Sequence, residues 1–169
     1  MTKEWCFDEF PGAISVSMIR KLRLLFRLPG VRWIALLCLC AAYLQGGISK
    51  AFDFEAAITE MRHFGLAPAA PLAIAVIVLE IGASLLILSG LYRWVGALAL
   101  GGFTLFATFL ANRFWDVPPD ERFMIENSFF EHLGLVGGFV LVAWHDLQKQ
   151  RFEANSREKK VQQDIRARG

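Results

Sequence analysis

The segment from residue 71 to residue 91, PLAIAVIVLEIGASLLILSGL, is apolar apart from one glutamate and two serines, and the glutamate is its only charged residue. As a helix rising 1.5 Å per residue, such a segment spans the ~30 Å hydrocarbon core of a bilayer. Three further apolar blocks follow the same pattern. The sequence therefore predicts an all-α membrane protein, a bundle of four transmembrane helices with approximate spans 33–49, 72–91, 94–111 and 129–145.

A soluble helical bundle is the alternative interpretation of the same pattern. Hydrophobic residues make up 55% of the chain, against about 45–50% in a typical soluble domain. The excess is concentrated in the four blocks, which polar segments separate. The second block also lacks the polar stripe that a helix at a water-exposed surface carries. These features favour the membrane.

Basic residues gather at the two ends of the chain, which suggests a division into a basic lead (1–32), a membrane domain (33–147) and a basic tail (148–169). By the positive-inside rule, both termini are expected in the cytoplasm. Residues 17–28 alternate basic and apolar side chains, which predicts a short amphipathic helix on the membrane surface. We expect the flanks to contact the lipid bilayer, and we expect no nucleic-acid partner.

Two polar segments connect the predicted spans on the opposite side. The first, 50–70, has apolar residues at helical spacing and predicts a short surface helix that ends near Gly65. The second, 113–127, contains two adjacent prolines and is predicted to be a loop.

Small residues recur within the predicted spans, in places four positions apart. Such spacing lets helix backbones approach closely inside a membrane. We expect these glycines to pack helices within one molecule, with a homo-oligomer as the alternative. The predicted packing residues are Gly46, Gly47, Gly82, Gly101, Gly134, Gly137 and Gly138.

The glutamate inside the second span is Glu80. A charge at this depth costs at least ~2.5–3.5 kcal/mol, so a carboxylate there has to be paired or protonated. Because successive spans run in opposite directions, several polar residues fall in the same half of the membrane as Glu80. The expected polar cluster, or ligand-binding site, is Gln45, Lys50, Glu80, Asn112 and His132.

Two interpretations of this cluster stay open. Glu80 and His132 are the candidate catalytic residues if the cluster exchanges protons beside a quinone headgroup or a small polar ligand. Alternatively, the cluster is a polar clamp that fixes the register of the helices. A haem is less favoured, because His132 lacks an opposing histidine at the same depth. No metal is expected, since the candidate ligands His63, Glu126, Glu131 and His132 lack the close spacing of a metal site.

The three cysteines, Cys6, Cys38 and Cys40, form no Cys-x-x-Cys motif. This argues against a disulfide framework and against thiol-based redox catalysis. The sequence contains no self-contained catalytic motif, so whether the chain is an enzyme is left open.

Three segments, GGISKAF (46–52), LEIGASLLILSGLYRWVGALAL (79–100) and RFWDVPPDERFMIENSFFEHLGLVGGFVLVAWHD (113–146), together resemble the DoxX family. The resemblance covers about residues 33–146 and implies a four-helix protein of the bacterial inner membrane. The family is named for a subunit of a thiosulfate:quinone oxidoreductase, and some members are associated with membrane oxidoreductase complexes. The motif positions it carries over are Lys50, Glu80, Arg93, His132, Gly137 and Gly138.

Two functional hypotheses follow. In the first, the chain is a membrane subunit of an oxidoreductase complex that handles quinol or anchors a soluble partner. In the second, it is a non-enzymatic scaffold or a small permease-like protein, and the basic tail docks a partner without any cofactor.

Overall fold

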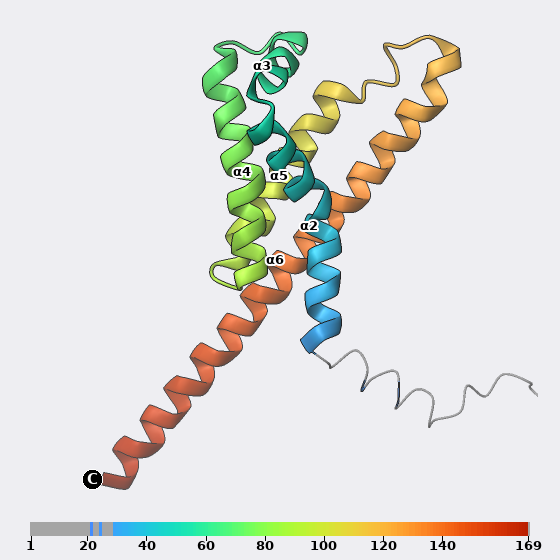
Figure 1. The fold of residues 1–169 in the computed structure, drawn as a ribbon. Coiled ribbons are helices and arrows are strands. Elements are labelled where there is room, and N and C mark those ends of the chain that lie inside the picture. Colours follow the sequence, from blue (N-terminus) through green and yellow to red (C-terminus); the bar gives the residue numbers. More distant parts are fainter. Residues whose placement is uncertain (1–20, 22–23, 25–28, 169) are drawn as a thin grey trace, which may run out of the picture. The chain divides into compact units, whose positions relative to one another are not determined.

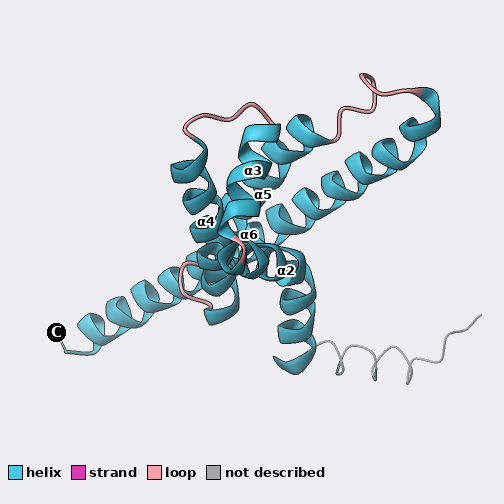
Figure 2. Cartoon of the chain, turned by 45° about the horizontal axis from the view of Figure 1, so that its top comes forward, coloured by secondary structure: helices cyan, strands magenta, loops and turns pink. Residues whose placement is uncertain are grey.

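The computed structural model describes residues 21, 24 and 29–168, and every regular element within them is an α-helix (Figures 1 and 2). This confirms the all-α prediction for the described residues. The chain divides into two units, Met1–Ala35 and Leu36–Gly169, and the contacts below belong to the second. The amphipathic helix predicted over 17–28 lies outside the described residues, apart from positions 21 and 24. The helices are α2 (Pro29–Phe52), α3 (Phe54–His63), α4 (Ala69–Ser89), α5 (Arg93–Ala111) and α6 (Pro119–Arg168).

Three of the described helices, α2, α4 and α5, are long and apolar enough to cross a membrane. They contain the first and third predicted spans, and the second as far as Ser89. The fourth predicted span, 129–145, is not a separate helix but part of α6. Glu131 and His132 precede its apolar stretch and His145 follows it, which leaves fewer residues between them than the roughly 20 that a typical span contains.

The prediction of a loop up to residue 127 is wrong, because α6 already begins at Pro119. Proline suits the first turn of a helix, where its missing N–H is not needed. Asp120 and Glu121 follow in that first turn, where negative charge is stabilised by the helix dipole. The irregular connection from α5 is therefore limited to residues 112–118.

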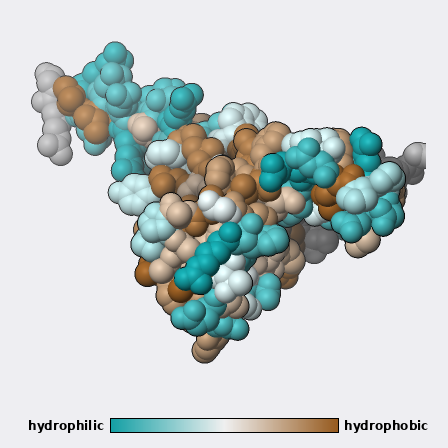
Figure 3. Space-filling model, turned by 90° about the horizontal axis from the view of Figure 1, so that it is seen from above, coloured by the Kyte–Doolittle hydropathy of each residue, from teal (hydrophilic) through white to brown (hydrophobic). Residues whose placement is uncertain are grey.

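Helix α6 is 50 residues long and continues through the predicted tail as far as Arg168. Hydrophilic side chains cover most of this extension, at the left of Figure 3. Three apolar side chains, Phe152, Val161 and Ile165, are nevertheless exposed on it. The tail is thus a continuous, largely polar helix.

The short helix predicted in the first connection is confirmed as α3. The carboxylate of Asp53 caps its first turn by accepting the N–H of Ala56 at 3.0 Å. The helix ends at His63, and Gly65 follows with φ of 70°, a left-handed conformation that glycine adopts readily. Its apolar face packs against the first turns of α4 through Ala57, Ile58, Met61 and Ala73.

The main core lies where α2, α4, α5 and α6 meet. Leu100 of α5 and Phe139 of α6 are fully buried there, and the ring of Tyr43 from α2 meets Phe139 edge-on at 5.4 Å between centroids. Because α2 and α4 run in opposite directions, the last turn of α2 comes level with the middle of α4. This arrangement brings together side chains distant in the sequence.

The N-terminus of α5 is fixed by a side chain of α6. The backbone N–H of Trp94 donates to Asp146 Oδ2 at 3.3 Å, and Gln150 Nε2 donates to the same oxygen at 3.1 Å. Asp146 is only 7% exposed. The negative charge of Asp146 lies beside the first turn of α5 and interacts favourably with the positive end of the helix dipole. Together with the hydrogen bond to Trp94, this interaction holds α5 and α6 together.

Candidate functional site

An ion pair joins Lys50, in the last turn of α2, to Glu80, in the middle of α4. Lys50 Nζ lies 3.2 Å from Oε1 and 3.3 Å from Oε2 of the glutamate. Only 18% of the lysine side chain and 7% of the glutamate side chain are exposed. Helical side chains lean toward the N-terminus of their helix, so Lys50 reaches back along α2 to the level of Glu80.

Two glycines of α2, Gly46 and Gly47, lie next to this carboxylate. A Cβ at Gly47 would lie 2.8 Å from Ile81 Cγ1 and 3.2 Å from Glu80 Cβ. At Gly46 a Cβ would lie 3.6 Å from Glu80 Oε2 and 3.7 Å from Lys50 Nζ. The absence of a side chain at Gly47 therefore allows α2 to approach α4 where the ion pair forms, whereas a Cβ at Gly46 would make only ordinary contacts.

A second carboxylate, that of Glu60, also reaches the lysine. Glu60 lies on α3 and places Oε2 4.0 Å from Lys50 Nζ, with 43% of its side chain exposed. The ammonium group therefore lies near two carboxylates. Glu60 was not among the predicted site residues, because its proximity depends on how α3 folds back over the ends of the longer helices.

A buried hydrogen bond between Tyr43 and Thr104 lies beside the ion pair and was also missed. The two hydroxyl oxygens are 2.6 Å apart. Thr104 donates its own proton to the carbonyl oxygen of Leu100 at 2.6 Å, so Tyr43 is the donor to Thr104. The lone pairs of the tyrosine oxygen are then free to accept a hydrogen bond.

His132 of α6 is oriented by Asn112 at the end of α5. The amide nitrogen of Asn112 donates to His132 Nδ1 at 2.7 Å. In the neutral ring the proton therefore resides on Nε2, which acts as a donor. Gln45, by contrast, is exposed and bonds to Ser49 at 3.1 Å, outside the cluster.

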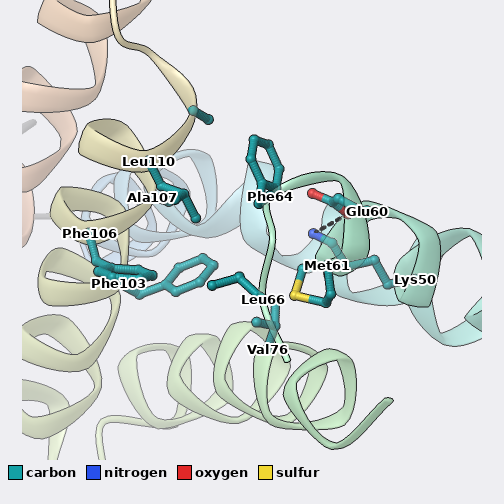
Figure 4. A pocket seen from close by; sticks show the side chains of 11 residues that line it. Lys50, Glu60, Met61, Phe64, Leu66, Val76, Phe103, Phe106, Ala107 and Leu110 are labelled. Atoms are coloured by element: carbon teal, nitrogen blue, oxygen red, sulfur yellow. Dashed lines mark ion pairs between the residues drawn. The ribbon is translucent and has the colours of Figure 1, made fainter. Parts of the chain in front are cut away.

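These groups line two adjoining cavities. The polar cavity has a volume of about 240 Å³ and includes Tyr43, Lys50, Glu60, Glu80, Thr104 and His132 in its walls. An apolar cavity of about 140 Å³ shares Lys50, Glu60, Phe103 and Ala107 with it. Figure 4 shows Phe103, Phe106 and Leu110 of α5 facing Met61 of α3, and Phe64 just after it, across the apolar cavity.

Comparison with protein families gave a match to the DoxX family model over residues 33–113. Residues 33–113 are a DoxX domain. The match runs from α2 through α5 and includes Lys50, Glu60 and Glu80, whereas His132 and the rest of α6 lie beyond it. Comparisons with curated proteins and with solved structures gave no match. The DoxX domain and the apolar helices together identify an integral membrane protein.

The glycines predicted to pack helices of this DoxX protein differ in their surroundings. Gly47 contacts α4, and a Cβ at Gly101 or Gly138 would lie 3.3 Å from Phe139 or Leu39. At Gly82, Gly134 and Gly137, a Cβ would meet nothing within 4 Å. Among the described glycines, the shortest distance from such a Cβ to a neighbouring helix is at Gly96. The four-residue spacing of small residues did not select this position.

Within residues 21, 24 and 29–168 of this DoxX protein, no group of three or more His, Cys, Asp and Glu side chains is arranged to hold a metal ion. Glu131 accepts a hydrogen bond from Asn127 at 2.6 Å. What the cavity does offer is a carboxylate that can accept a proton and, on another helix, an imidazole that can donate one. Such a pair suits proton exchange with a bound molecule.

Proposed function

We propose that this DoxX protein is a membrane subunit of an oxidoreductase complex and binds a quinone-class molecule in the polar cavity. The observation that carries this proposal is the position of Glu80. Its side chain is 7% exposed and ion-paired, yet it lines a cavity of about 240 Å³. An ionisable group deep in a transmembrane helix is costly, and residues of this kind commonly mark a ligand or proton pathway.

The proposal includes a transmembrane arrangement. In it, residues 129–145 of α6 form a fourth span, and both termini lie in the cytoplasm of a bacterium whose inner membrane holds the protein. The basic residues of the tail, among them Lys159 and Lys160, support this orientation. The cavity then lies in the half of the membrane that faces away from the cytoplasm, and α3 lies on the non-cytoplasmic side of the cavity.

A quinone-class ligand would supply the transfer of two electrons and two protons between the membrane pool and a partner subunit. The residues of this chain would handle the protons. Glu80 would accept one proton from a ligand hydroxyl, with Lys50 stabilising its carboxylate form, and the carboxylate of Glu60 in the same wall would accept the second proton. His132, held by Asn112, presents Nε2–H to the same cavity. The aromatic side chains of the apolar cavity contact the ring.

Replacing Glu80 with glutamine tests this role. The change preserves volume and leaves Lys50 beside Glu60, so we expect a folded protein. The quinone-dependent activity of the purified complex should fall at least ~100-fold, the lower end of the effect of removing a general acid or base. Glu55→Gln, an exposed change on α3, is the matched control and should leave activity unchanged. A stable Glu80→Gln complex with normal activity would reject the role.

A non-enzymatic scaffold is the second candidate function. The continuation of α6 to Arg168 favours it, because this helix presents both charges and the exposed side chains of Phe152, Val161 and Ile165 to a partner. In a scaffold, Glu80 is a clamp between α2 and α4. The same glutamine variant distinguishes the candidates, since a scaffold predicts an intact complex with full activity.

A further inference from the structure

The polar cavity has more hydrogen-bond acceptors than donors. Lys50 is its one lysine or arginine among the described residues, and it lies 3.2 Å from Glu80 and 4.0 Å from Glu60. We propose that the cavity selects a ligand whose polar end is an uncharged hydroxyl group, a phenol or hydroquinone, and that it disfavours carboxylate and phosphate headgroups. This inference rests on the proposed function and specifies which form of the ligand the site prefers.

The hydrogen-bonding capacity of the walls supports this choice. Each oxygen of the Glu80 carboxylate contacts Lys50 but keeps lone pairs that can accept another hydrogen bond. Glu60 adds a second carboxylate, and Tyr43 adds an oxygen whose proton is already directed to Thr104. A hydroxyl group can donate to any of these acceptors, and hydrogen bonds to a charged acceptor are the stronger kind.

An anionic headgroup meets the opposite situation. It would approach two carboxylates, and the ammonium group of Lys50 is already engaged by both. This geometry therefore does not favour binding of an anionic group by Lys50. A cationic headgroup would compete with Lys50 for the same carboxylate oxygens, whereas a neutral hydroxyl group can donate to them while the ion pair stays in place, which makes the hydroxyl the best match.

The apolar cavity indicates what the rest of the ligand is. Phe103 lines both cavities, and Phe64, Phe106 and Leu110 belong to the apolar wall (Figure 4). The two cavities, of about 140 and 240 Å³, together reach the lower end of the roughly 300–1,000 Å³ typical of small-molecule sites. An aromatic ring with its first few chain carbons matches this size and lining.

Binding of three probes with the same decyl chain tests the selection: decylhydroquinone, decylbenzoquinone and the fatty acid undecanoate. The full chain is placed in nanodiscs of zwitterionic lipid under argon, and dissociation constants are measured by calorimetry against empty nanodiscs. We expect the hydroquinone to bind at least about tenfold more tightly than the quinone, and the fatty acid to show no binding above the empty discs.

The double variant Glu60→Gln/Glu80→Gln should reverse the selection. It removes both carboxylates and leaves Lys50 as an uncompensated cation, so undecanoate should now bind and the preference for hydroquinone should disappear. Glu60→Gln alone changes only the more exposed partner and should reduce the preference while Glu80 stays paired. Glu55→Gln is the control with unchanged binding.

The outcomes separate this inference from the proposed function. Equal binding of quinone and hydroquinone, or binding of undecanoate by the unmodified protein, would overturn the selection but leave a quinone-binding subunit intact. Binding of none of the three probes would overturn both.

Discussion

Replacing Lys50 with methionine should lower the free energy of unfolding by about 3–5 kcal/mol, the usual result of removing one partner from a buried ion pair. The glutamate that it leaves behind is 7% exposed and loses both of its contacts with the ammonium group. Glu80→Gln should cost much less, about 1 kcal/mol, because a neutral amide takes the place of the buried carboxylate and Lys50 still has Glu60 as a partner.

Thermal unfolding of the purified variants in one detergent measures this asymmetry. The double variant Lys50→Met/Glu80→Gln should recover most of the stability lost in Lys50→Met, because no unpaired charge stays buried beside α2. A double-mutant cycle then gives the coupling energy of the pair directly. Equal destabilisation by the two single changes, or no rescue in the double variant, would show that the ion pair is not the dominant interaction here.

Gly96→Ala should destabilise the protein by about 1–3 kcal/mol, the range for inserting a methyl group into a packed core. A Cβ at Gly96 would lie 2.6 Å from the backbone carbonyl oxygen of Ala83, and 3.0 Å from Leu86 Cβ. Backbone atoms of α4 cannot rotate away as the end of a flexible side chain can. The two helices would have to separate at the point where α5 begins.

Gly102→Ala is the matched control on the same helix. A Cβ there would meet nothing within 4 Å, so the change should be neutral or stabilise α5 by up to about 1 kcal/mol through its higher helix propensity. The melting temperatures of the two variants in detergent give the comparison. If Gly96→Ala is as stable as Gly102→Ala, the close approach of α4 and α5 at this point does not contribute to stability.

Hydropathy predicts the apolar helices well because the bilayer requires about twenty apolar residues in each. Helix α3 is also predictable, from the spacing of Phe54, Ile58 and Met61 and from the glycine that follows. The start of α6 is not, because polar residues and two prolines indicate a loop, whereas Pro119 is compatible with a first helical turn. Composition alone does not distinguish a loop from the first turn of a helix at these residues.

Close helix contacts are harder to predict than helices. Spacing four residues apart selects Gly134, yet the close contact at Gly96 depends on how α5 is rotated about its axis toward α4. The sequence contains no strong signal for that rotation. Hydropathy therefore locates the helices in the chain, but the spacing of small residues finds only some of the glycines at which they touch.

The candidate site, too, was only partly predictable from the sequence. Lys50 and Glu80 are predictable because a charge in an apolar span needs a partner, and the structure brings them together. Glu60, Tyr43 and Thr104 were missed because a surface glutamate and two hydroxyl groups are unremarkable as isolated residues. They become part of the site only once α3 and α5 are packed beside the ion pair.

Quinone content of the purified protein tests the central proposal, a quinone-class ligand in the polar cavity, most directly. The protein is extracted from membranes in mild detergent and its bound quinone is quantified, alongside Gly46→Leu and Gly102→Leu. Gly46 lines the cavity, and a Cβ added there would lie within 3.7 Å of both charged groups, so leucine fills the space without removing a charge. We predict near-stoichiometric quinone in the unmodified protein and in Gly102→Leu, and a loss of most of it in Gly46→Leu. Absence of quinone from the unmodified protein, or equal content in all three, would contradict the proposal.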